Sequence, residues 1–145
     1  QLSIGHCQLE LGLYEEARKS YFKVEYLAPG NKKVWRPIGW CSFVTGKKEQ
    51  AEKYFLKLMN DEPNKHDFMN MGHVQWSLGN RKPALGYYKK SISANGFAEA
   101  EFLEIFEEDL HHLLAWGVDK DDVPIMLDQL RYSLEEGNSQ SFTTP

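Results

Sequence analysis

The sequence predicts an all-α fold built from repeated helical hairpins, and three observations carry that prediction. Landmark residues recur at intervals of 33 or 34 positions between Gln1 and Gly96. Apolar residues between these landmarks are spaced three or four apart, as they are on one face of a helix. Glycine and proline fall where such helices would turn or end. A fixed period of this length indicates stacked supersecondary units, none of which buries its apolar face alone.

Small residues mark the period most clearly. Ala17, Ala51 and Ala84 are separated by 34 and 33 residues. Two series of glycines and the residues that close each unit keep the same two intervals. These are Gly5, Gly39 and Gly72; Gly12, Gly46 and Gly79; and Pro29, Pro63 and Gly96. The intervals divide residues 1–97 into the units 1–31, which is truncated at its start, 32–64 and 65–97.

Each unit contains two helical stripes with a glycine between them. In the first unit the second stripe consists of Tyr14, Ala17, Tyr21, Val24 and Leu27. The glycine between stripes predicts a left-handed turn that ends one helix before the next begins. Pro29 and Pro63 then stop the second helix, because proline cannot continue the hydrogen-bond ladder. We expect Gly39 and Ala51 to let the two helices of a hairpin approach to about 8–10 Å.

These landmarks resemble the tetratricopeptide repeat family, whose pattern places a large residue, Leu-Gly, an aromatic, Ala, an aromatic and Pro at set offsets. The middle unit supplies Trp35, Ile38, Gly39, Ala51, Phe55 and Pro63. The third supplies Phe68, Met71, Gly72, Ala84 and Tyr88, with Gly96 in place of the proline, and the first supplies Ile4, Gly5, Ala17, Tyr21 and Pro29. The resemblance covers residues 1–96 and implies a right-handed α-α superhelix, a solenoid of helical hairpins.

From Ala98 onward the repeat spacing is lost while the helical period continues. Phe102, Phe106, Leu110 and Leu113 keep an apolar stripe, but Phe106 stands where a fourth unit would have its glycine. We therefore expect residues 98–136 to form a degenerate fourth helical hairpin or a cap, with a final helix ending at Gly137. The polar stretch 137–145 is expected to be a disordered tail.

Composition and motifs exclude several classes of protein. The net charge of −4 offers no basic surface for nucleic acid. The uncharged run 37–46 is too short to insert into a membrane, and no other run without Asp, Glu, Lys or Arg is long enough to do so. No HExxH, CxxC or GxSxG motif is present, and neither His111 with His112 nor His66 with His73 is spaced to chelate one ion. The sequence thus predicts no enzyme, no cofactor and no metal site.

The two cysteines occupy equivalent positions in neighbouring units. Cys7 and Cys41 are 34 residues apart, and equivalent positions on packed helices lie beyond the roughly 7 Å that a disulfide can bridge. We interpret them as reduced, small apolar fillers between helices. Unpaired cysteines and the lack of a visible secretion signal favour the cytoplasm. Because the chain begins inside an amphipathic pattern, we interpret it as a fragment of a longer protein.

The family resemblance also places a candidate binding groove. In such solenoids the first helix of every hairpin lines a concave face, and the corresponding positions can be read from this sequence. The predicted peptide-binding residues are His6, Leu9, Lys33, Arg36, Trp40, Phe43, Met69, His73 and Trp76, with Leu2, Glu10, Val44, His66 and Asn70 on the same face. We expect the aromatic and methionine side chains to form an exposed apolar patch, with the lysine and arginine at its edge.

Two functions agree with this groove. The first is a non-catalytic interaction scaffold that binds a peptide or protein segment in the groove. The second is a structural module whose groove is filled by its own chain and which positions other domains of the parent protein. Exposed ends of the solenoid also make a homo-dimer a further expectation.

Overall fold

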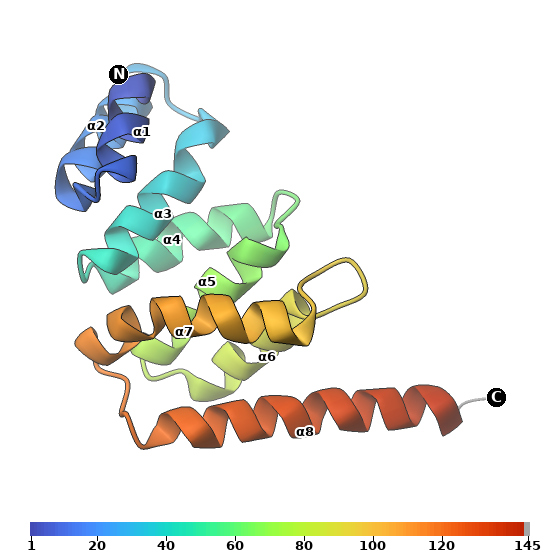
Figure 1. Ribbon diagram of the computed structural model, residues 1–145. Coiled ribbons are helices and arrows are strands. Elements are labelled where there is room, and N and C mark those ends of the chain that lie inside the picture. The colour runs from blue at the N-terminus through green and yellow to red at the C-terminus, as the bar shows by residue number, and fades with distance from the viewer. Residues whose placement is uncertain (144–145) are drawn as a thin grey trace. The chain divides into compact units, whose positions relative to one another are not determined.

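The computed structural model describes the backbone of residues 1–143 and the side chains of residues 1–137 (Figure 1). Within that part of the chain every regular element is helical, which confirms the predicted all-α class. The elements are α1 (Leu2–Glu10), α2 (Tyr14–Leu27), the 3-10 turn η1 (Lys32–Val34), α3 (Trp35–Val44), α4 (Lys48–Met59), α5 (Lys65–Ser77), α6 (Arg81–Ser91), α7 (Glu99–Ala115) and α8 (Asp122–Thr143).

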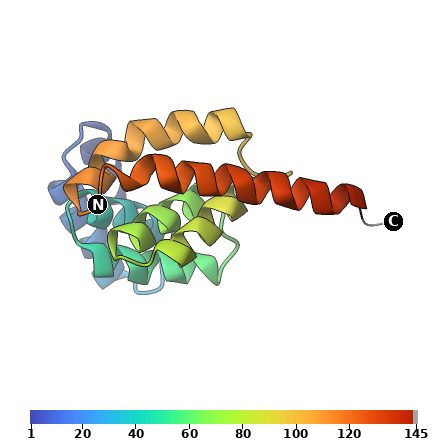
Figure 2. The same ribbon diagram turned by 90° about the horizontal axis from the view of Figure 1, so that it is seen from below.

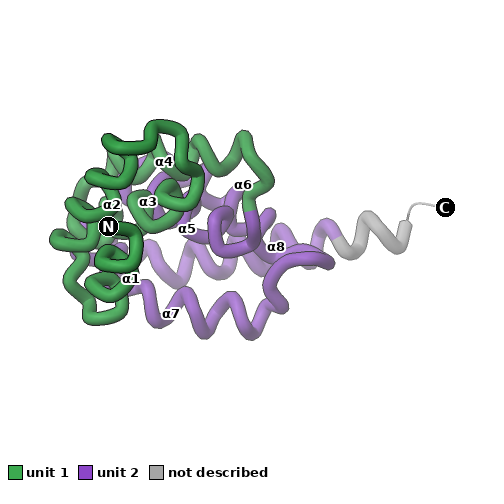
Figure 3. Tube along the Cα trace, turned by 90° about the horizontal axis from the view of Figure 1, so that it is seen from above, with its two compact units in different colours: residues 1–63 green, residues 64–145 purple. Residues whose placement is uncertain are grey.

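The chain divides into two compact units, Gln1–Pro63 and Asn64–Pro145 (Figure 3). The first contains α1 to α4 and the second contains α5 to α8. The division falls within one residue of the boundary that the repeat period sets between its second and third units. The three-unit organisation itself stays a prediction.

Consecutive helices pack as three hairpins, α1 with α2, α3 with α4, and α5 with α6. Each hairpin turns at a glycine in the left-handed region, with φ of 75° at Gly12, 83° at Gly46 and 87° at Gly79. In each turn the amide after the glycine donates to the carbonyl five residues before it, which satisfies an end group of the first helix. The donor and acceptor pairs are Leu13 to Gln8 (2.9 Å), Lys47 to Ser42 (2.8 Å) and Asn80 to Gln75 (2.8 Å). The predicted left-handed turns are confirmed.

A second glycine in each hairpin lies directly beneath an aromatic ring. A Cβ added to Gly5 would lie 2.8 Å from the Tyr21 ring, and one added to Gly72 would lie 2.5 Å from the Tyr88 ring. At Gly39 the equivalent distance to the Phe55 ring is 3.0 Å. The rings occupy the space that a larger residue would need, so the periodic glycines are required by the packing of one helix on the next.

The last two helices both lie on the third hairpin. Helix α7 packs on α5 and α8 packs on α6, and Figure 2 shows α7 and α8 running in opposite directions. The interpretation of residues 98–136 as a degenerate fourth helical hairpin or a cap stays a prediction. The sequence predicted that the final helix would end at Gly137, whereas α8 continues to Thr143. The disordered tail expected for residues 137–145 reaches beyond the described residues and stays a prediction.

The two cysteines differ in their surroundings. Both are free thiols, and Cys41 is buried while Cys7 is exposed. The interpretation as a filler between helices therefore fits Cys41 but is wrong for Cys7. Burial raises the pKa of the Cys41 thiol from 9.0 to about 12, so this thiol stays protonated at neutral pH.

Candidate functional site

The predicted groove residues of the first compact unit, Gln1–Pro63, divide into accessible and buried positions. Lys33 and Arg36 are exposed, and Trp40 is half-buried one helical turn after Arg36 on α3. Phe43 was expected in the exposed apolar patch, but it is fully buried with its ring centroid 6.0 Å from that of Trp40. On α1, the neighbouring candidate His6 is exposed and Leu9 is half-buried.

In the second compact unit, which begins at Asn64, three predicted groove residues are buried. Met69, His73 and Trp76 on α5 have exposed fractions of 1%, 0% and 5%. The Trp76 ring stacks on Phe106 of α7 with a centroid distance of 6.3 Å. The prediction of an exposed patch is therefore wrong for these residues, because α7 covers the face of α5 that carries His73 and Trp76.

An aromatic cluster holds α7 against the third hairpin. Tyr88 of α6 lies with its ring centroid 5.6 Å from Phe102 and 5.9 Å from Phe106. Phe102 and Phe106 stack on each other at 5.9 Å, and all three side chains are buried. Aromatic pairs of this kind contribute about 0.5–1.5 kcal/mol each beyond the burial of their surface. Phe106, which departs from the repeat pattern, is therefore the side chain that links α7 to two helices.

A buried polar chain crosses the same cluster. His73 Nδ1 lies 2.7 Å from the Tyr88 hydroxyl, and His73 Nε2 lies 3.0 Å from a carboxylate oxygen of Asp109. An ionised carboxylate only accepts hydrogen bonds, so Nε2 carries a proton and donates it to Asp109. In the neutral ring Nδ1 then accepts from the Tyr88 hydroxyl. The chain joins α6, α5 and α7 through groups that would be costly to bury alone.

The first hairpin contains a matching pair. His6 Nδ1 lies 2.6 Å from the Tyr21 hydroxyl, and the two residues are 15 positions apart, as His73 and Tyr88 are. The middle hairpin has Trp40 and Phe55 at the corresponding positions, so neither hydrogen-bonding group is present there. His73 was expected to face a ligand, but its ring joins helices inside the fold.

Two segments of the chain match the model of a known protein family. The tetratricopeptide repeat family model matches residues 1–31 and 68–96, which cover the first hairpin and most of the third. These two segments of the chain are tetratricopeptide repeats. The middle hairpin, 32–64, keeps the same glycine, alanine and aromatic landmarks. A search of curated proteins found no match.

Tetratricopeptide repeats are generally protein–protein interaction modules and belong to a non-catalytic type of scaffold. The described residues contain no group of three or more His, Cys, Asp or Glu side chains placed to hold a metal ion. Across the same residues, no helix combines the length and the apolar character that crossing a membrane requires.

The central residue of the Tyr88–His73–Asp109 hydrogen-bond chain is not accessible to solvent, because His73 is fully buried. Its role in the repeat is therefore to connect helices.

Burial of Tyr88 in the Tyr88–His73–Asp109 hydrogen-bond chain predicts that the protein loses stability at alkaline pH. Burial, followed by the negative charge of Asp109, raises the pKa of Tyr88 well above its ordinary value of 10.0. Below pH 10 the phenol is protonated in both folded and unfolded chains. As the pH rises above 10, the unfolded phenol ionises while the folded one keeps its proton, so the free energy of unfolding falls. Urea denaturation at a series of pH values through this range measures that loss.

Tyr88→Phe removes the ionisable group and should make the alkaline loss smaller. At neutral pH the same substitution should cost about 1 kcal/mol, because His73 loses its partner. Tyr132→Phe is the control, since Tyr132 is 66% exposed. Equal alkaline losses in the wild-type chain and Tyr88→Phe would contradict the assignment.

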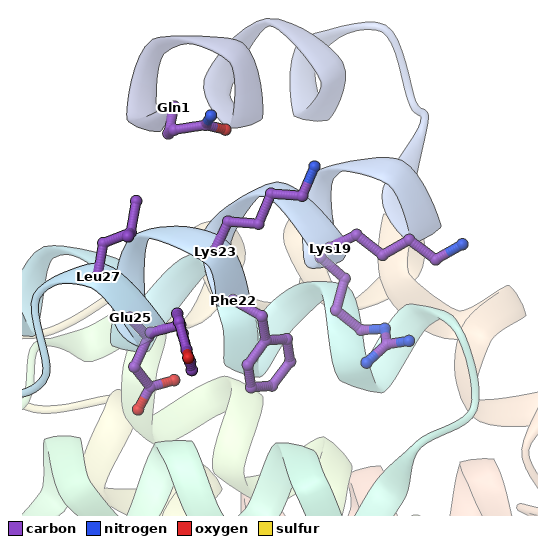
Figure 4. A pocket seen from close by; sticks show the side chains of 8 residues that line it. Gln1, Lys19, Phe22, Lys23, Glu25 and Leu27 are labelled. Atoms are coloured by element: carbon purple, nitrogen blue, oxygen red, sulfur yellow. The ribbon is translucent and has the colours of Figure 1, made fainter.

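A further hollow, which was not predicted from the sequence, lies on α2. It has a volume of about 810 Å³, and Figure 4 shows Gln1 facing α2 across it. Its lining residues are Gln1, Arg18, Lys19, Phe22, Lys23, Glu25, Tyr26 and Leu27. Tyr26 and Leu27 are 85% and 71% exposed. The position of Tyr26 outside the main stripe of α2 was the available sequence signal.

Proposed function

We propose that this chain is a non-catalytic module that binds a segment of another protein at the second tetratricopeptide repeat. In this proposal Lys33, Arg36 and Trp40 contact the partner. The inner face of the third repeat is filled by α7 of the same chain. The observation that carries the proposal is the difference in exposure between these two sets of predicted groove residues.

The chemistry of the exposed set suggests the kind of segment. Arginine and tryptophan are over-represented among the residues that dominate binding energy at protein interfaces. Two cations beside a half-buried indole suit an acidic side chain close to an apolar one. The partner segment would therefore carry a carboxylate for Lys33 or Arg36 and an apolar residue for Trp40.

The alternative is a structural module whose groove is entirely self-filled. The burial of Met69, His73 and Trp76 favours it, since these residues already have partners within their own unit. It differs from the first proposal in what it expects of α3. A structural module needs no ligand at Trp40.

An array of peptides that pair acidic and apolar residues, probed with the full chain, separates the two. Trp40→Ala and Arg36→Glu should each weaken the best peptide at least tenfold, about 1.4 kcal/mol. Leu56→Ala is the matched control in the same unit, because Leu56 is 42% exposed on α4. Binding that survives both α3 substitutions, or no binding at all, would instead favour the structural module.

A further inference from the structure

Helices α7 and α8 flank an apolar cleft in the second unit. Its volume is about 310 Å³, and it is lined by Leu103, Phe106, Leu110, Val123 and Leu127 together with Glu107. Leu103, Leu110 and Leu127 are only half-buried, so their side chains remain partly open to solvent. The cleft differs from the groove assigned under the proposed function, because it lies between the two helices that follow the third hairpin.

The segment that forms the cleft is strongly acidic. Residues 98–136 contain twelve acidic and two basic side chains, a net charge of −10, whereas the whole chain carries −4. Some of these acids are neutralised within the fold, such as Glu101 by Lys65 and Asp122 by Arg81. The exposed acids of α7 that form no ion pair among the described side chains include Glu104, Glu107 and Glu108.

The shape of the cleft suits a helix better than an extended strand. Leu103 and Leu110 are seven residues apart on α7, so they are about 10 Å apart along its axis. A helix that presents apolar residues at positions i, i+3, i+4 and i+7 has anchors over the same length. The described residues contain no strand whose edge could pair with an extended peptide. The volume is at the small end of ligand pockets, about 300–1,000 Å³, so the cleft takes side chains rather than a whole helix.

We propose that the α7–α8 cleft docks a basic amphipathic helix of a partner protein. Apolar side chains of that helix enter between Leu103, Leu110 and Leu127. Its lysines and arginines face the carboxylates of Glu104, Glu107 and Glu108. Anionic partners such as nucleic acid and acidic lipid surfaces are disfavoured, because a field of this sign repels phosphate.

A synthetic peptide provides the probe. It carries leucine at i, i+3, i+4 and i+7, lysine at the remaining positions and a fluorescein label, and its anisotropy is measured with the full chain. The triple substitution Glu104→Gln, Glu107→Gln, Glu108→Gln should weaken binding at least tenfold. The loss should shrink as salt rises, because salt screens the charges that the triple variant removes. Leu127→Asn should weaken binding by a similar factor through its apolar contact.

Two control variants match these changes. Ile125→Asn places the same polar residue on α8 at a position that is 52% exposed and does not line the cleft. Glu135→Gln with Glu136→Gln removes two exposed acids of α8 that lie beyond the cleft. Both controls should bind the peptide as the wild-type chain does. The acidic variants change only exposed side chains, so they keep the test decisive if Leu127→Asn fails to fold by circular dichroism.

Several outcomes would overturn the proposal. Equal binding of a peptide with glutamate in place of lysine would show that charge does not select the ligand. Losses in Ile125→Asn as large as those in Leu127→Asn would place the peptide elsewhere. Loss of binding in Trp40→Ala would move the peptide to the site of the proposed function, whereas an unchanged affinity there keeps the two sites distinct. A salt-sensitive increase in mass with protein concentration, without peptide binding, would assign the cleft to a second copy of the chain.

Discussion

Replacing Phe106 by alanine is expected to lower the free energy of unfolding by about 3–5 kcal/mol. Phe106 is 2% exposed, and its ring lies against Trp76, Phe102, Tyr88 and His73. Removing it opens a cavity where α7 meets α5 and α6. Urea denaturation followed by circular dichroism measures the loss, and acrylamide quenching of tryptophan fluorescence should increase as Trp76 is uncovered.

Leu114→Ala is the control for this substitution. Leu114 lies on the same helix but is 38% exposed, so its truncation should cost about 1 kcal/mol or less. If Phe106→Ala denatured at the same urea concentration as Leu114→Ala, α7 would not be held by the aromatic cluster. The claim that α7 fills the inner face of the third repeat would then lose its support.

Replacing Gly72 by alanine is expected to destabilise the fold by about 1–3 kcal/mol through overpacking. The added Cβ would lie 2.5 Å from the Tyr88 ring. Tyr88 is fully buried, and Phe102, Phe106 and His73 surround it, so its ring has no free space to move into. The melting temperature and the urea midpoint should both fall.

A second helical glycine of the same hairpin gives a control of opposite sign. A Cβ on Gly86 in α6 would meet nothing within 4 Å. Gly86→Ala should therefore stabilise the chain by about 0.4–1 kcal/mol, because alanine restricts the unfolded chain at no steric cost. Equal effects at Gly72 and Gly86 would show that helix propensity, and not the contact with Tyr88, explains the periodic glycine.

The hairpins could be predicted from the sequence because they depend on local turns and on neighbouring helices. Gly12, Gly46 and Gly79 indicate where the hairpins turn, since few other residues adopt their left-handed backbone conformation. The glycine under each aromatic ring could be predicted for a similar reason. The two residues are 16 positions apart in all three hairpins, so the contact is repeated with the period.

The burial of the third repeat's inner face could not be predicted in the same way. It depends on α7, where the period is lost, and on contacts between distant positions such as His73 with Asp109, which are 36 residues apart. Phe106 was recognised as a departure from the repeat, but a departure alone does not say which surface the phenylalanine covers. Knowing that required the place of α7 against α5.

The histidine and tyrosine that meet in the first and third hairpins constrain how such genes can be shuffled. His6 with Tyr21 and His73 with Tyr88 each join the two helices of one hairpin, while Trp40 and Phe55 form the apolar version. A recombination breakpoint inside a hairpin that joined the middle hairpin to either of the others would combine a histidine with a phenylalanine, or a tryptophan with a tyrosine. Such a hybrid leaves one polar group of the pair without its partner, so exchange with the middle repeat keeps both kinds of pair intact only when whole hairpins are inherited together.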